Sequence, residues 1–236
     1  MGIPVTTVDP ALPTVASPGS AAATAFDAAA GPVDELDRQV AAYVDLGFPA
    51  LLGIDEAAFR ARVAPLADAL PTAPAAPAVD GDGAAFVLVL PGLDVNDAAP
   101  AMRRGTRVGM SVIDRDEAPT YRPIAGLDTP ADPYLLVDVD TGSEFCGVRP
   151  EDALVTITGR GRTPLTIDEG VAVAVVRPDL LRPNKCFSLP GSRTGTNQRV
   201  PAVWISERRA KLGWCWDRNP HTWLGAASAA RRVVGS

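Results

Sequence analysis

The residue types that most often carry chemistry gather near the C-terminal end of the sequence. The only histidine, His221, lies in the same segment as Cys186 and Cys215. A thiol beside an imidazole is a common nucleophile–base pair, and it needs a third group, such as Asn219 or Asp217, to orient the imidazole. Cysteines are also frequent as small buried side chains. The pattern therefore names Cys186, Cys215 and His221 as catalytic candidates, with core packing as the alternative.

All four tryptophans fall in the same part of the chain. They are Trp204, Trp214, Trp216 and Trp223. In a strand, Trp214 and Trp216 share one face because they are two residues apart. Two such rings can sandwich a sugar, a base or an acyl chain, and they can equally fill the core of a small sheet. We expect at least two of the four rings to be core residues.

The segment 189–199 (LPGSRTGTNQR) is the strongest candidate for an anion-binding loop. It combines glycines and hydroxyl side chains with Arg193 and Arg199. Such a loop suits a phosphate or a carboxylate, although a solvated hairpin loop has the same composition. Because it has neither the Walker nor the Rossmann spacing, we expect no nucleotide cofactor.

Metal binding has weaker support. Cys146, Cys186, Cys215 and His221 give the number of ligands that zinc needs, but no two of them have the close spacing of a zinc motif. The segment 135–142 (LLVDVDTG) resembles the first motif of the haloacid-dehalogenase-like phosphotransferases, but the acidic pair that this family carries after a later strand is missing. We therefore interpret residues 140–142 as a turn and expect no metal site.

Charge is distributed unevenly along the chain. The formal net charge is −6, with the acidic residues concentrated in the first 140 positions. In residues 182–236 only Glu207 and Asp217 are acidic, against many arginines. Either the two halves neutralise each other in the fold, or the C-terminal part presents a face that attracts anions.

Hydrophobic periodicity and turn residues predict an α+β fold. Pro65 should kink or end the second helix, and Thr166 with Glu169 fits a capping box. We expect N-terminal helices packed on a mixed or antiparallel sheet, followed by a β-rich C-terminal lobe. The expected helices are 33–46, 55–70 and two that begin at Pro150 and Thr166; the expected strands are 84–90, 108–113, 134–139, 202–206 and 212–216.

The chain organisation suggests a single domain over residues 32–236. Residues 1–31 have the composition of a disordered tail, and residues 71–83 that of an internal linker. The sequence shows neither a secretory leader nor an apolar run long enough for a membrane span. Together with the sparse cysteines, this predicts a cytoplasmic protein with reduced thiols.

Several motifs in the C-terminal half are similar to an uncharacterised actinobacterial family, domain of unknown function 5701. The similarity extends from about Asp34 to Gly225, and it implies no activity or site residues. The motifs are TPLTIDEG (163–170), CFSLPGSR (186–193), VPAVWIS (200–206), KLGWCW (211–216) and NPHTWLG (219–225).

The sequence favours binding of a small anionic or polar ligand in a C-terminal pocket, with or without enzymatic processing. The ligand-binding candidates are Arg193, Arg199, Trp214, Trp216, Asn219 and Trp223. The alternative is an accessory protein that docks on RNA or a ribonucleoprotein through its basic, aromatic C-terminal face. The overall acidity of the chain argues against that alternative.

Overall fold

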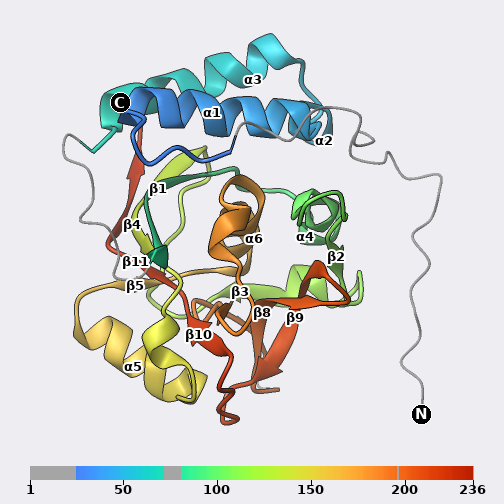
Figure 1. The fold of residues 1–236 in the computed structure, drawn as a ribbon, viewed down its shortest axis with the longest axis vertical. Coiled ribbons are helices and arrows are strands. Elements are labelled where there is room, and N and C mark those ends of the chain that lie inside the picture. The colour runs from blue at the N-terminus through green and yellow to red at the C-terminus, as the bar shows by residue number, and fades with distance from the viewer. Residues whose placement is uncertain (1–24, 72–80, 196, 236) are drawn as a thin grey trace.

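Two sheets with a central helix between them form the protein. A computed structural model describes residues 25–71, 81–195 and 197–235. Figure 1 shows α6 (Ile167–Val176) in the middle, between the β1–β4 pair and the β8–β9 hairpin. The remaining α-helices are α1 (Pro32–Asp45), α2 (Phe48–Leu51), α3 (Glu56–Val63), α4 (Val95–Ala98) and α5 (Pro150–Gly159).

The first sheet is antiparallel and has β4 at its centre. The strand β1 pairs along one edge of β4, while β11 and β12 pair along the other. The last strand of the chain therefore returns to the middle of the molecule. The strands of this sheet are β1 (Gly83–Val89), β4 (Tyr134–Asp140), β5 (Thr163–Pro164), β11 (Ser228–Ala229) and β12 (Arg231–Val234).

The second sheet is mixed and is built around the β8–β9 hairpin. Its order is β10-β6-β8-β9-β2; the outer pairs β10–β6 and β2–β9 are parallel, and the inner pairs are antiparallel. A separate two-stranded ribbon joins β3 (Tyr121–Pro123) to β7 (Ser192–Thr194). The strands of the second sheet are β2 (Met110–Ser111), β6 (Cys186–Ser188), β8 (Arg199–Ser206), β9 (Arg209–Trp216) and β10 (Leu224–Ala226).

The β-branched residues of α6 form a helix because a reciprocal capping box stabilises its first turn. The backbone N–H of Glu169 donates to the Thr166 hydroxyl, and the Glu169 carboxylate accepts from the Thr166 N–H at 2.7 Å. The run VAVAVV is apolar all round because the helix contacts sheets on two sides. The capping box expected from the sequence is thereby confirmed.

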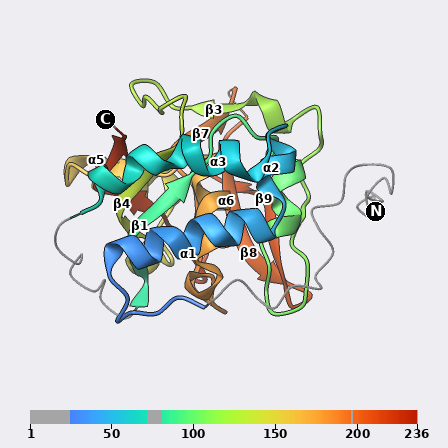
Figure 2. The same cartoon turned by 90° about the horizontal axis from the view of Figure 1, so that it is seen from above.

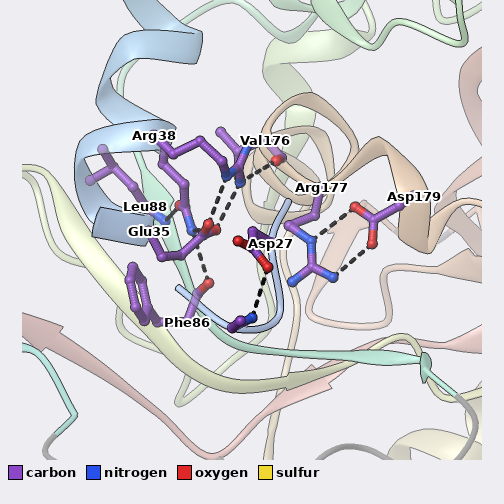
Figure 3. A network of polar contacts seen from close by, with 10 residues as sticks. Asp27, Glu35, Arg38, Phe86, Leu88, Val176, Arg177 and Asp179 are labelled. Carbon is purple, nitrogen blue, oxygen red and sulfur yellow. Dashed lines mark hydrogen bonds and ion pairs between the residues drawn. The ribbon is translucent and has the colours of Figure 1, made fainter. Parts of the chain in front are cut away.

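Helices α1 and α3 cover the top of the β1 strand and of α6 (Figure 2). Buried polar groups fix α1 there: the Gln39 side chain donates to the Phe86 carbonyl at 3.2 Å and accepts from the Leu88 N–H at 2.7 Å. Arg38 bonds to Glu35 and also donates to the carbonyl of Val176 at the end of α6 (Figure 3). This network joins α1 to both the strand and the central helix.

The expected fold class is confirmed, with local differences. Asp55 caps α3, and at Pro65 the chain changes from α-helix to the 3-10 helix Ala64–Ala69, as the proline predicts. The strand expected at 108–113 shortens to Met110–Ser111. Most of the expected tail and linker, residues 1–24 and 72–80, lies outside the described residues; within residues 25–31, the Phe26 ring lies 3.5 Å from the guanidinium of Arg177.

Candidate functional site

Trp214, Trp216 and Arg199 form one continuous surface on the β8–β9 hairpin. Arg199 is the cross-strand partner of Trp216, so their side chains emerge on the same face. The Arg199 guanidinium carbon lies 4.2 Å from the centroid of the Trp214 ring, and the two indoles meet edge to face at 5.0 Å. We call these three residues the tryptophan face.

Glu117, just before β3, and Tyr121, the first residue of β3, border the tryptophan face with an acidic partner. Glu117 accepts from Nη1 of Arg199 at 2.6 Å and from the Tyr121 hydroxyl at 3.1 Å. Burial, followed by the charge of Glu117, raises the pKa of Tyr121, so this hydroxyl stays a donor. The result is a paired donor and acceptor beside the rings. Trp216 remains 47% exposed, while Trp214 is half-buried.

Arg193 lies on the opposite side of the hairpin from the tryptophan face. It forms an ion pair with Asp217 at 2.9 Å and donates to the backbone carbonyl of Pro190 at 2.8 Å. Cys215 points away from Trp214 and Trp216 by the alternation of β9, and Asp217, which follows the strand and whose N–H donates to the Gln198 carbonyl, continues that alternation. Burial lowers the pKa of Arg193 and raises that of Asp217. Arg193 and Arg199 therefore do not converge on one anion.

The cysteine and histidine candidates do not form a nucleophile–base pair. Burial raises the pKa of the Cys215 thiol to about 12 and also raises that of Cys186. Within the described residues, no hydrogen bond joins either sulfur to His221. The His221 ring instead lies 5.2 Å from that of Trp223, and its carbonyl accepts from the Gly147 N–H at 2.8 Å.

The other candidates also have clear positions. Asn219 is exposed, and its N–H donates to the Trp216 carbonyl at 3.1 Å. Trp204 is half-buried and covers Gly213, where any side chain would collide with its ring. All three cysteines are free. Across the described parts of the chain, no group of three or more His, Cys, Asp or Glu side chains is placed to hold a metal ion.

A recess that the sequence did not suggest lies apart from the tryptophans, between α1, α4 and α6. It is small, with a cavity volume of about 20 Å³, and its walls are apolar, with Tyr43 and Phe48 packed edge to face. Asp168, in the first turn of α6, is the one charged residue that lines it. Asp168 as a whole is exposed at the rim of the recess. Desolvation of its carboxyl by neighbouring atoms raises the pKa of Asp168 above its usual value, the charge of the adjacent Glu169 adds to this, and Arg122 opposes it.

Sequence reasoning missed Glu117, Tyr121 and Asp168. Glu117 lies in a turn and Tyr121 begins the short strand β3, and Glu117 reaches Arg199 only through tertiary folding. Asp168 lies within the capping-box sequence that predicted the start of α6. No local sequence pattern indicates that the helix face with Asp168 and Val171 borders a recess.

Comparison with known proteins identifies the family of the chain. The model of a family of unknown function (DUF5701) matches residues 42–235. The chain belongs to this family. The resemblance of the sequence motifs to domain of unknown function 5701 is thereby confirmed. No curated protein and no solved structure matches the chain, so within this family the site must be judged on its own geometry. The described helices include none long and apolar enough to cross a membrane.

Proposed function

We propose that this member of the family binds a small polar ligand with a flat face, such as a sugar or a heteroaromatic ring, on the tryptophan face. The observation that carries the proposal is the arrangement of Trp216: its indole is 47% exposed and is held edge to face by Trp214, whose own ring is covered by Arg199. A large apolar ring in water is unfavourable, and a stacked ligand would cover it.

The polar groups at the edge of this surface define the ligand further. Arg199 is a donor with 30% of its side chain exposed, and Glu117, bonded to it, is an acceptor. A neighbouring carboxylate opposes the approach of a strongly anionic ligand. The pair therefore favours a neutral or zwitterionic ligand that carries both donors and acceptors. Of the two ligand types expected from the sequence, this supports the polar one.

We propose binding without covalent catalysis at this surface. The thiol of Cys215 lies on the other side of β9, and with a pKa of about 12 it is protonated at neutral pH. A protonated thiol is a poor nucleophile. We retain the cytoplasm as the expected compartment, because free cysteines are typical of reducing surroundings.

The test is to identify what the protein carries. Small molecules are extracted from purified wild type and from Trp216→Ala, with Trp204→Phe as the matched control, and analysed by mass spectrometry. The proposal expects a polar ring compound with wild type and the control that is absent from Trp216→Ala. The same compound in equal amount on all three proteins would refute it.

A further inference from the structure

A second surface, at the other end of the β8–β9 hairpin, gathers positive charge from two separate parts of the sequence. The strands β2 and β9 pair in parallel, with Met110 opposite Lys211. The loop before β2 therefore lies beside the turn that joins β8 to β9, as Figure 1 shows for β2 itself. Nη1 of Arg209 contacts the sulfur of Met110 at 4.0 Å, which links the two segments directly.

Several arginines at this end have no acidic partner among the described residues. Elsewhere most arginines are paired, as Arg115 is with Asp97 at 2.8 Å. Among the described residues, no carboxylate lies within ion-pair distance of the following four: Arg104, Arg107, Arg208 and Arg209. Together with Lys211 we call these residues the basic end.

One acid in the described turn between β8 and β9 partly offsets this charge. Glu207 bonds to Lys211 at 3.2 Å and is itself 71% exposed. The Nε atom of Arg209 is buried and has no acceptor within the described residues. An excess of exposed cations is unfavourable in the free protein, and an anionic partner would relieve it.

The turn between β8 and β9 also indicates that its side chains matter. Glu207 and Arg208 both have left-handed backbones, with φ of 54° and 62°. A two-residue hairpin turn of this kind favours Asn-Gly, because residues with a Cβ are strained there by about 1 kcal/mol or more each. Charged side chains thus occupy positions where glycine would be easier, and Arg208 is held at the exposed tip.

We infer that the basic end binds the phosphate backbone of a nucleic acid. Guanidinium groups bond phosphate oxygens in pairs, and a row of phosphates can neutralise cations spread over two loops, whereas one small anion cannot. An anionic membrane fits less well, because the large exposed apolar residues beside β2 are Val108 and Val112, with no aromatic or leucine side chain for insertion. The half-buried Trp204, cross-strand partner of Lys211, offers a ring beside this surface.

The experiment uses the full chain and fluorescence anisotropy. Labelled oligouridylate and oligothymidylate of about 20 nucleotides are longer than the ~4–16 nucleotides that one binding module covers. The variant is Arg107→Glu/Arg208→Glu, both exposed, with Arg107→Gln/Arg208→Gln as a milder form if the first loses its fold by circular dichroism. The matched control is Arg231→Glu, an exposed arginine of β12 for which the described residues provide no ion pair.

Wild type should bind at least one oligonucleotide, and the affinity should fall steeply between about 50 and 200 mM NaCl because counterions are released. The double glutamate variant should bind at least about tenfold more weakly with a shallower salt dependence, while Arg231→Glu stays within about twofold. Three results would overturn the inference: no binding at low salt, equal loss in the Arg231 control, or binding to phosphatidylserine vesicles and to neither oligonucleotide.

Discussion

Glu169 and Arg232 form a buried ion pair that joins the first turn of α6 to the last strand of the chain. The Nε–Oε1 distance is 2.6 Å, and the two side chains are 0% and 8% exposed. The same carboxylate accepts from the Tyr134 hydroxyl at 2.7 Å and from the Thr166 N–H at 2.7 Å. Four elements, β4, α6, β12 and the loop before α6, therefore depend on one carboxylate.

Removing one partner of this pair should be costly. Arg232→Met leaves the Glu169 charge buried without its cation, so the free energy of unfolding should fall by about 3–5 kcal/mol. The double variant Glu169→Gln/Arg232→Met should recover part of that loss, because no uncompensated charge remains. Urea denaturation of both, with the exposed Arg231→Met as the control, measures the difference. A loss below about 1 kcal/mol for Arg232→Met would show that the pair does not hold β12 in place.

The thiols should differ in reactivity. Cys186 and Cys215 are buried with raised pKa values. Cys146 is half-buried; desolvation also raises its pKa, and nearby Lys185 opposes this in part. Native protein treated with iodoacetamide at pH 8 should therefore be labelled first at Cys146, and at the other two only after unfolding. Peptide mass spectrometry gives the order. Rapid labelling of Cys215 in the native protein would instead revive its role as a nucleophile.

Asp168 should make stability depend on pH between about 4 and 6. Because its pKa is about 6 in the folded protein and near 3.8 when unfolded, the folded state holds the proton more tightly. This contribution is fully present below pH 3.8 and is lost as the pH rises through 6. Asp168→Asn should therefore raise the melting temperature at pH 7.5 relative to wild type, and this gain should shrink at pH 4.

The control for that comparison is Asp97→Asn, which removes a surface carboxylate of α4 whose side chain is 39% exposed. A melting temperature of Asp168→Asn that follows wild type in parallel from pH 4 to 7.5 would mean that Asp168 has an ordinary pKa. The carboxyl at the rim of the recess would then make no pH-dependent contribution to stability.

Local signals in the sequence predicted local structure well. Thr166 and Glu169 predicted the start of α6, Pro65 the end of α3, and the two-residue spacing of Trp214 and Trp216 their common face. These features depend on hydrogen bonds within a few residues or on the period of a strand.

The rest depends on contacts that no local pattern encodes. Arg232 meets Glu169 from 63 positions away, and Glu117 meets Arg199 from 82. The pocket was predicted on the assumption that residues close in sequence converge. The alternation of β9 instead places Cys215, and Asp217 just after the strand, on one side, and Trp214 and Trp216 on the other. His221 follows the loop after β9 and joins Trp223 instead. Its role in ligand binding, like that of Asn219, stays a prediction.

Trp216 is the side chain that the proposed ligand should contact, and nuclear magnetic resonance can observe its indole directly. The indole N–H signals of the four tryptophans are assigned with single Trp→Phe variants in ¹⁵N-labelled protein. The compound recovered from the wild type, or adenosine and maltose as probes of the two ring types, is then titrated. Stacking on an aromatic side chain contributes about 1–3 kcal/mol, so Trp216→Ala should weaken binding roughly tenfold.

If the ligand binds on the tryptophan face, the signals of Trp216 and Trp214 should shift together with one dissociation constant, while those of Trp204 and Trp223 should stay in place. Shifts confined to Trp204 or Trp223, or no shift of Trp216 under saturating ligand, would contradict it.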